Sequence, residues 1–197
     1  MIDPKKVTNY KRNKTQLQEW LLYCVCVAGK KSEIETRKLA SFLRDGRMGF
    51  NLSPFNLIRK LLGISSVEED GLMQQLKKYS IAPYGQRYNS FRDVVTLLPD
   101  DLSEVTLEDL MEVRGISTKT SRFFLTHSRE DFDEPVLDTH ILRFLSEEGY
   151  RVPSATPQNE AEYARVAKIF RSIANYEGKS VTDLDLEVWK QYSYGAV

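Results

Sequence analysis

The sequence predicts an all-α protein. Helix start signals, in which Ser, Thr or Asp precedes apolar residues spaced three or four apart, recur along almost the whole chain. In several places an acidic or amide residue follows three positions later, as in a capping box. No segment shows the sustained alternation of apolar and polar residues that is typical of a half-buried strand. Together these observations predict roughly ten short helices.

In the first half of the chain, each predicted helix opens at a residue suited to cap it. The start signals are, in order, Thr15 with Gln18, Ser32 with Glu35, Ser53 before Pro54, Ser66 with Glu69, and Pro83. Glycines or a change of pattern end these helices, at Ala28, Gly46, Gly63, Tyr79 and Leu98. The resulting segments carry enough apolar residues on one face to form a core.

The second half shows the same pattern of helix start and stop signals, with one unusually short helix. Its start signals are Thr106 with Asp109, the residues about Thr118, Asp138, Thr156 before Pro157, and Thr182 with Asp185. Glycine ends three of these helices, at Gly115, Gly149 and Gly178. The helix from Thr106 is therefore cut short after LEDLMEV, and a new helix follows directly.

Composition places the chain among ordinary globular proteins, with 41% hydrophobic and 28% charged residues in 197. The length fits one large domain or two small helical lobes. No apolar run approaches the roughly 18 residues of a membrane span, and the N-terminus has no apolar secretory segment. We therefore expect no membrane partner and a cytoplasmic location, associated with the nucleoid or, if the gene is of phage origin, in the host cytoplasm.

Charge leaves the class of partner open. The 28 basic and 28 acidic residues cancel, whereas nucleic-acid binders usually carry a basic face. However, the N-terminal stretch 5–14 is basic and the stretch 99–112 is acidic, so a basic stripe remains compatible with zero net charge. Cys24 and Cys26 lie in an apolar run and predict buried thiols, and two cysteines cannot ligate an iron–sulfur cluster. We expect no metal and no cofactor.

The run VRGISTKTSRFFL predicts a helix, a tight turn and a second helix. The turn Gly115-Ile116-Ser117 directs backbone N–H groups outward at a helix N-terminus, which is a site suited to a phosphate. Such a hairpin holds a DNA backbone without reading its sequence. An ordinary turn between two helices fits the same residues, so this pattern alone leaves both interpretations open.

Two ionisable residues near this turn are candidate catalytic groups. Lys119 lies in the first turn of the second helix, where the positive end of the dipole and nearby Arg122 disfavour the ammonium, so we expect its pKa to fall. A neutral lysine can attack an electrophilic carbon and form a Schiff base. Asp138 precedes THILRFL as an N-cap, a position that keeps a carboxylate ionised. Taken singly, the two residues fit a solvated surface lysine and an ordinary N-cap better than an active site.

Together, these residues resemble the active-site segment of the helix-hairpin-helix DNA glycosylases. That family, which includes endonuclease III and the adenine and 8-oxoguanine glycosylases, has a G-h-G-x-K-T hairpin followed by an aspartate in a V-D-x-H-h-x-R context. RGISTKTS and VLDTHILRFL match its lysine, aspartate and spacing. WLLYCVCVAGKKSEIETRKLASFL occupies the place of its early helix pair, and DLDLEVWKQYSYG resembles the ending of the small microbial 8-oxoguanine glycosylases that lack an iron–sulfur cluster.

The resemblance implies a fold and a set of lobes. It implies two helical lobes flanking a cleft, with the helix-hairpin-helix at about 106–126, in a single unit spanning 1–197. One lobe would comprise about 30–125, and the other the N-terminal helix with about 127–197. The chain departs from the family at Arg114, which replaces a proline, and at Ser117, which replaces a glycine and would cost roughly 1 kcal/mol if its φ were positive.

The activity implied is that of a bifunctional DNA glycosylase and AP lyase acting on double-stranded DNA as a monomer. A damaged base, with 8-oxoguanine the first candidate, would be flipped into the cleft. Asp138 would stabilise the positive charge on the sugar, and Lys119 would attack C1′ and form an imine. His140 would brace the helix that Asp138 opens.

Other candidate contacts follow from position in the sequence, each with a structural alternative. Expected DNA contacts are Arg114, Gly115, Ser117, Thr120, Lys30, Lys31, Gln86 and Arg87. Lys30 and Lys31 lie where relatives place the residue that fills the gap in the duplex, although a solvated loop also fits. Trp189 and Tyr192 are candidates for stacking on the flipped base, and their spacing equally fits a helix core.

Two other functions fit the same fold. Some phage enzymes derived from this family modify hypermodified thymines in DNA by group transfer to the base. Alternatively, the chain is a DNA-binding module that has lost catalysis and uses only its hairpin, although the Lys119–Asp138 pair argues against this. The sequence leaves open which base is recognised.

Overall fold

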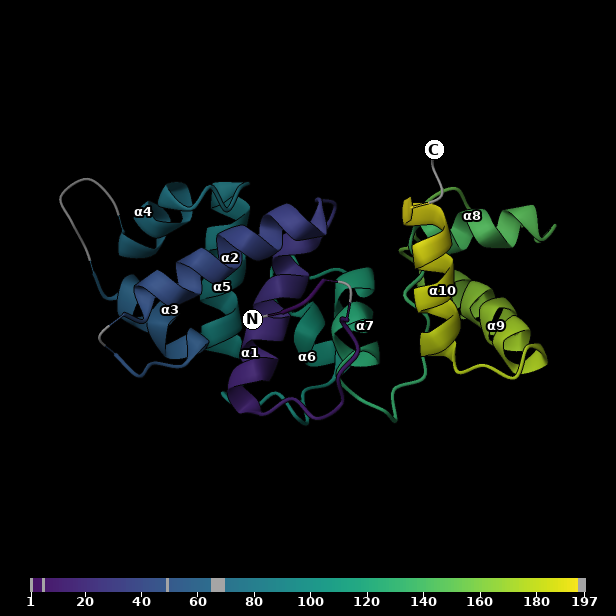
Figure 1. Cartoon of the computed structure of the whole chain (residues 1–197), viewed down its shortest axis with the longest axis horizontal. Coiled ribbons are helices and arrows are strands. Elements are labelled where there is room, and N and C mark those ends of the chain that lie inside the picture. The colour runs from purple at the N-terminus through teal and green to yellow at the C-terminus, as the bar shows by residue number, and fades with distance from the viewer. Residues whose placement is uncertain (1, 5, 49, 65–69, 195–197) are drawn as a thin grey trace. The chain divides into compact units, whose positions relative to one another are not determined.

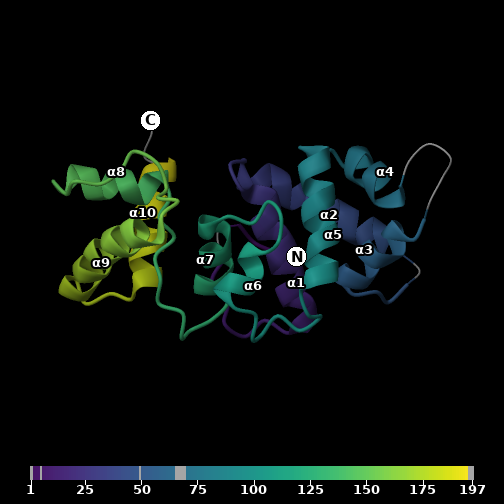
Figure 2. The ribbon, with the colours of Figure 1, turned by 180° about the vertical axis from the view of Figure 1, so that it is seen from behind.

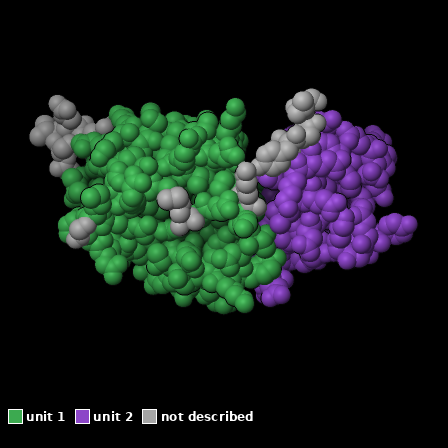
Figure 3. All heavy atoms as spheres, viewed as in Figure 1, with its two compact units in different colours: residues 1–124 green, residues 125–197 purple. Residues whose placement is uncertain are grey.

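The computed structural model is helical throughout and confirms the predicted all-α class (Figure 1). It describes residues 2–4, 6–48, 50–64 and 70–194. For residues 193 and 194 it describes the backbone alone. The chain divides into two compact units, residues 1–124 and 125–197, which Figure 3 colours separately. Within the described residues there are ten helices and no strand.

Unit 1 contains the first six helices and most of the seventh. Their bounds are α1 (Lys14–Val27), α2 (Ser32–Gly46), α3 (Pro54–Leu62), α4 (Gly71–Lys78), α5 (Tyr84–Leu97), α6 (Leu107–Met111) and α7 (Thr118–Thr126). Helix α1 packs against α2, α3 and α5, and α5 also packs against α3 and α4. Because α1 shares its core with α2 and α3, the N-terminal helix belongs to unit 1, which corrects its expected place in the second lobe.

Helix α7 is joined to this core through Trp20 of α1. The indole of Trp20 is fully buried, and its Nε1 donates a hydrogen bond of 3.0 Å to the carbonyl oxygen of Phe124. The ring of Phe123 lies 5.1 Å from that of Trp20, centroid to centroid. Figure 2 shows α6 and α7 beside α1 from the opposite side of the molecule. A buried indole with its N–H satisfied therefore fixes the helix that carries Lys119.

Unit 2 is a three-helix group. Its helices are α8 (Thr139–Glu147), α9 (Glu160–Tyr176) and α10 (Val181–Tyr194), and α10 packs against both others. The core consists of apolar side chains from all three and from the segment before α8, namely Leu137, Ile141, Leu142, Leu145, Tyr163, Val166, Ala167, Phe170, Ala174, Val181, Leu184 and Val188.

The predicted caps of α3, α6 and α8 are confirmed. The Ser53 hydroxyl accepts from the backbone N–H of Asn56 at the start of α3. Thr106 and Asp109 form the expected capping box of α6. Asp138 is the N-cap of α8. At each of these starts the local sequence offers one strong cap, so no competing signal displaces it.

Other helix starts differ from those expected. Helix α1 is capped by Asn13 with Gln16, where Thr15 with Gln18 was expected, and α2 begins after Lys31, where Ser32 was expected. Helix α9 is capped by Asn159 and not by Thr156. Helix α10 is capped by Ser180 with Asp183 and not by Thr182 with Asp185. The expected start at Ser66 lies outside the described residues, and α4 begins after Asp70. Gln18 is instead buried, donating to the carbonyl of Asp100 and accepting from the N–H of Phe55.

Candidate active site

The hairpin between α6 and α7 forms as the sequence predicts. Gly115 has a φ of +84°, in the left-handed region that glycine adopts without strain. The N–H of Ile116 donates to the carbonyl of Val113 at 3.1 Å, and both side chains are buried. The turn is thus anchored by an apolar residue on each side of the glycine, while Gly115 itself is exposed.

Gly115 also lies too close to α5 for a side chain. A Cβ built on this residue would come within 2.4 Å of the Oγ of Ser90, far inside van der Waals contact. Ser90 is fully buried on α5, and its hydroxyl donates to the carbonyl of Gln86. Glycine is therefore required here both by the backbone angle and by the approach of α5.

We expect Gly115→Ala to destabilise unit 1 by more than the ~1 kcal/mol of a positive φ alone, because the new methyl group must also displace Ser90. Urea denaturation measures this change. Gly85→Ala is the matched control, because a Cβ on this α5 glycine meets nothing within 4 Å and alanine favours a helix by up to ~1 kcal/mol. Equal stability of Gly115→Ala and the wild type contradicts the packing described here.

Ser117 caps α7 and avoids the strain expected for it. In the described residues, only Ser80 among non-glycine residues has a positive φ, so the expected penalty at Ser117 does not arise. Its Oγ accepts from the N–H of Thr120 at 3.3 Å, and its carbonyl accepts from the N–H of Ser121 at 2.9 Å. A serine suits this position better than the family glycine as a cap, because it satisfies one N–H of the first turn.

Thr120 belongs to the interior of the hairpin. Its side chain is buried, and its Oγ1 lies 3.2 Å from the Oγ of Ser117. The DNA contact expected of Thr120 is therefore corrected to an internal contact that holds the cap. Ser117 is exposed and remains a predicted DNA contact.

Arg114 binds α5. Its Nε and Nη2 donate to the two carboxylate oxygens of Asp93 at 2.5 and 2.6 Å, a bidentate pair. Asp93 is buried, and hydrogen bonding to Arg114 lowers the pKa of its carboxyl group. This guanidinium holds the hairpin onto α5, the helix that also touches Gly115, while 55% of the side chain is exposed, so its contact with a DNA phosphate stays a prediction.

Lys119 is the second residue of α7 and is half-buried. It follows the Ser117 cap directly, at the positive end of the helix dipole. The helix it stands on is fixed at its other end by the Trp20 hydrogen bond described above. The position is the one that the sequence predicts, in unit 1.

Asp138 lies in unit 2, at the start of α8. One carboxylate oxygen, Oδ1, accepts from the backbone N–H of His140 at 2.8 Å and from that of Ile141 at 3.0 Å. Its carbonyl accepts from the N–H of Leu142 at 2.9 Å. The side chain is half-buried. Hydrogen bonds from the α8 N-terminus fix the orientation of this carboxylate.

The expected contacts from α1, α2 and α5 separate into exposed and buried residues. Lys30 and Lys31 are exposed in the turn between α1 and α2, and Gln86 is exposed on α5. Arg87 is only 5% exposed, and its Nη2 donates to the carbonyl of Cys26 at 3.0 Å. The expectation that Arg87 contacts DNA is therefore wrong, because its guanidinium is used inside unit 1 at the C-terminal end of α1.

The two aromatic candidates on α10 are half-buried. The Tyr192 hydroxyl donates to Glu147 of α8, and the guanidinium of Arg143 lies 5.1 Å from the Tyr192 ring centroid. The ring of His140 lies 6.5 Å from the same ring. These contacts tie Tyr192 to α8 within unit 2. Base stacking by Trp189 and Tyr192 stays a prediction.

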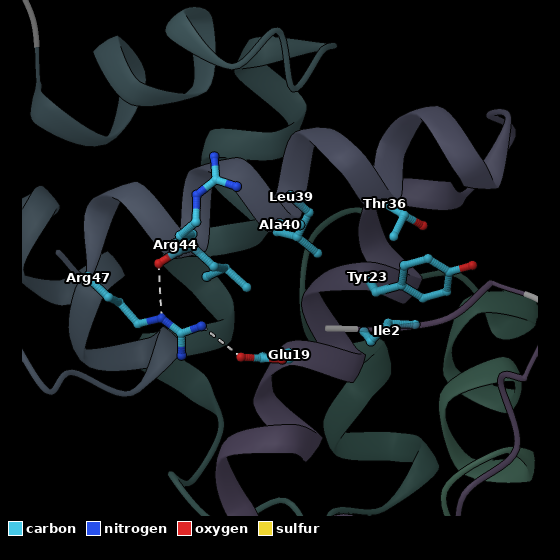
Figure 4. Close-up of a pocket in the computed structure, with 9 residues that line it drawn as sticks. Ile2, Glu19, Tyr23, Thr36, Leu39, Ala40, Arg44 and Arg47 are labelled. Carbon is cyan, nitrogen blue, oxygen red and sulfur yellow. Dashed lines mark hydrogen bonds and ion pairs between the residues drawn. The ribbon is translucent and has the colours of Figure 1, made fainter.

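A cavity of about 200 Å³ lies apart from these residues, between α1 and α2 (Figure 4). Glu19 and Arg47 form an ion pair at its edge, 2.9 Å apart. The other lining residues are Ile2, Tyr23, Thr36, Leu39, Ala40, Leu43 and Arg44. None of them is a residue that the sequence singles out. Nearby on α1, Cys24 and Cys26 are buried as expected, and burial raises the pKa of both thiols, that of Cys26 to about 12.

Comparisons with known proteins bear on the sequence and the fold. No family model matches the chain. A curated "8-oxoguanine DNA glycosylase/AP lyase" of Saccharolobus solfataricus is 28% identical over 113 residues, or 57% of this chain and 54% of that protein. The chain thus matches about half the length of this relative. The protein of the same name from Methanocaldococcus jannaschii is 25% identical over 194 residues, covering 95% of this chain and 87% of that protein.

A solved structure provides the same comparison for the fold. The crystal structure of the Methanocaldococcus jannaschii 8-oxoguanine glycosylase/lyase, in complex with a 15mer DNA containing 8-oxoguanine, matches with a TM-score of 0.68. The match covers 98% of this chain and 89% of that chain at 19% identity. This chain is similar to the 8-oxoguanine DNA glycosylases. The similarity to these glycosylases rests on the sequence matches, and the helical fold is consistent with it.

Three residues near the candidate site were not predicted from the sequence. They are Asp93, Tyr163 and Asp185, all buried and all bound to residues close to Lys119 or Asp138 in the sequence. An aspartate in an otherwise buried helical face, as at Asp93, is the signal that could have been followed. None of the helices in the described part of the chain has the length and apolarity needed to cross a bilayer.

Proposed function

We propose that this chain is a bifunctional 8-oxoguanine DNA glycosylase/AP lyase. It removes the damaged base from double-stranded DNA after flipping the nucleotide, and then cleaves the strand through a Schiff base. We further propose that the two compact units act as one glycosylase, as a monomer, in the cytoplasm where the DNA lies.

One observation carries the proposal. A half-buried lysine begins the second helix of a hairpin, and an aspartate caps the next helix with a fixed carboxylate, in a chain aligned over 95% of its length with an 8-oxoguanine DNA glycosylase/AP lyase. These are the two groups that the reaction needs, an amine nucleophile and an anion beside a developing cation. A surface lysine and an ordinary cap have no reason to occur together at this spacing.

The proposed chemistry assigns one role to each residue. As the bond between C1′ and the base nitrogen breaks, the electron pair leaves with the base, and the Asp138 carboxylate stabilises the positive charge left on the sugar. Nζ of Lys119 forms a bond to C1′ and loses its protons as the sugar ring opens to an imine. Loss of a proton from C2′ then expels the 3′ phosphate, which cleaves the strand.

The hairpin and its neighbours hold the DNA in this proposal. Exposed Gly115 and Ser117 present the start of α7 to one backbone phosphate, which needs no sequence recognition. Exposed Lys30, Lys31 and Gln86 supply further contacts to the duplex. Arg114 holds the hairpin against α5 through its ion pair with Asp93.

Borohydride trapping tests the proposal. The purified chain is incubated with duplexes that each carry one oxidised purine or pyrimidine, and sodium borohydride reduces any imine to a stable amine. We expect a covalent protein–DNA adduct with the 8-oxoguanine duplex, together with released base and a cleaved strand. An undamaged duplex of the same sequence is the control.

Each other outcome replaces the proposal with a definite alternative. An adduct with a different lesion, and none with 8-oxoguanine, changes the substrate and keeps the reaction. Binding without adduct, abasic product or strand cleavage on any lesion identifies a non-catalytic DNA-binding module. Alteration of a modified thymine with its glycosidic bond intact identifies a base-modifying enzyme.

A further inference from the structure

The segment Pro135–Asp138 is held by side chains from three other parts of unit 2. The N–H of Val136 donates to Oδ2 of Asp185 on α10 at 2.9 Å, and the N–H of Leu137 donates to the hydroxyl of Tyr163 on α9 at 3.0 Å. The same hydroxyl donates to the carbonyl of Pro135 at 2.7 Å. Thr156, in the segment before α9, donates its hydroxyl to the carbonyl of Leu137 at 2.8 Å.

These four hydrogen bonds replace the backbone pairing that a helix or sheet would provide. Residues 135–137 are buried and belong to no helix, so their backbone N–H and carbonyl groups need partners inside the protein. Tyr163 is fully buried and Asp185 is 7% exposed.

The position of Asp138 is therefore fixed from both sides. The residue before it is bound at both its N–H and its carbonyl, by Tyr163 and Thr156. The residues after it are bound to its own carboxylate at the start of α8. A carboxylate that must stabilise charge on a sugar has to be held within a fraction of an ångström, since small displacements lower the rate strongly.

We propose that Tyr163, Thr156 and Asp185 are positioning residues that act through Asp138, an inference that rests on the proposed function. Their hydrogen bonds described above go to the backbone leading to the carboxylate. The simpler alternative is that the same bonds only stabilise unit 2. The two roles differ in whether the effect of a substitution depends on the Asp138 carboxylate.

Tyr163→Phe removes both hydrogen bonds of the hydroxyl and keeps the ring in the core. We expect the single-turnover rate of base release from the lesion duplex to fall about tenfold. Affinity for that duplex stays unchanged, because no DNA contact is lost. Tyr176→Phe is the matched control on the same helix, where the side chain is 92% exposed, and we expect no change of rate.

The decisive comparison repeats Tyr163→Phe in the Asp138→Asn background, with enzyme in excess over DNA. We expect no further loss of rate there, because residues that act through one group give non-additive effects. A loss by the same factor in both backgrounds overturns the inference and leaves Tyr163 as a structural residue. No loss in the wild-type background overturns it as well.

Thr156 provides a second measurement that does not depend on the activity of Asp138→Asn. Thr156→Val, of the same shape, removes the hydroxyl, and Thr156→Ser retains it. We expect Thr156→Val to lower the rate of base release at unchanged affinity for the duplex, and Thr156→Ser to restore it. Equal rates for both variants overturn the role of Thr156. Circular dichroism at the assay temperature verifies that each variant is folded.

Failure of this inference and failure of the proposed function give different results. A wild-type chain that releases no base from any lesion refutes the proposed function, and the inference with it. An active wild type with a fully active Tyr163→Phe refutes the inference alone. If Tyr163→Phe does not fold, Asp185→Asn, which retains an acceptor oxygen for the N–H of Val136, is compared with Asp185→Leu, which has none, and equal rates refute the inference.

Discussion

Lys119→Gln is expected to abolish the covalent adduct with DNA. Glutamine keeps the length and helix preference of the side chain but has no amine that can bond to C1′. We expect strand cleavage to fall by at least about a thousandfold, as for loss of a nucleophile. Borohydride trapping and gel analysis of the 8-oxoguanine duplex measure both effects. Binding of the duplex is retained, because the hairpin cap at Ser117 is untouched.

A lysine elsewhere on the surface serves as the control for this variant. Lys168 is exposed on α9, so Lys168→Gln removes the same charge from the chain. We expect Lys168→Gln to form the adduct at the wild-type rate. An adduct that persists in Lys119→Gln identifies a different nucleophile and contradicts the assignment.

Asp138→Asn separates the chemistry of this residue from its structural role. Asparagine caps a helix about as well as aspartate, so the hydrogen bonds to His140 and Ile141 are kept and the stability of unit 2 changes little. The negative charge is lost. We expect the rate of base release to fall by roughly a hundredfold to a thousandfold, the effect of losing one preorganised electrostatic group.

Thermal unfolding and single-turnover kinetics together check this expectation. Asp138→Ala, in contrast, loses the cap as well and is expected to lower stability by about 1 kcal/mol. If Asp138→Asn releases base as fast as the wild type, the carboxylate is only a cap and the proposed mechanism has no anion. If Asp138→Asn unfolds, the two roles are inseparable by this route.

Most of the fold follows from local signals in the sequence. Where one strong cap stands alone, as at Ser53, Thr106 and Asp138, the predicted helix start is confirmed. Where two capping patterns overlap, the local pattern does not decide between them. At α10 the structure uses Ser180 with Asp183, and Asp185, expected as the capping partner, is instead buried against Val136.

The candidate site was only partly predictable, for a related reason. Lys119 and Asp138 stand at helix starts, which short-range patterns mark, and the resemblance to known glycosylases identifies them together. Arg87 and Arg114 are cations whose partners lie elsewhere in the chain, at Cys26 and Asp93. A charged residue in a sequence gives no sign of such a partner, so the burial of Arg87 and the ion pair of Arg114 could not be predicted.

The contact between Gly115 and Ser90 has a consequence for engineering. Because Gly115 lies against the Ser90 hydroxyl of α5, the size of side chain allowed at position 115 depends on the residue at position 90. A hairpin transplanted from a known glycosylase is expected to dock here best when the α5 residue that it contacts is transplanted with it. In chimeras built by exchanging residues 106–126 alone, Ser90 stays in place, so a donor hairpin with any side chain at the position of Gly115 is expected to clash with it.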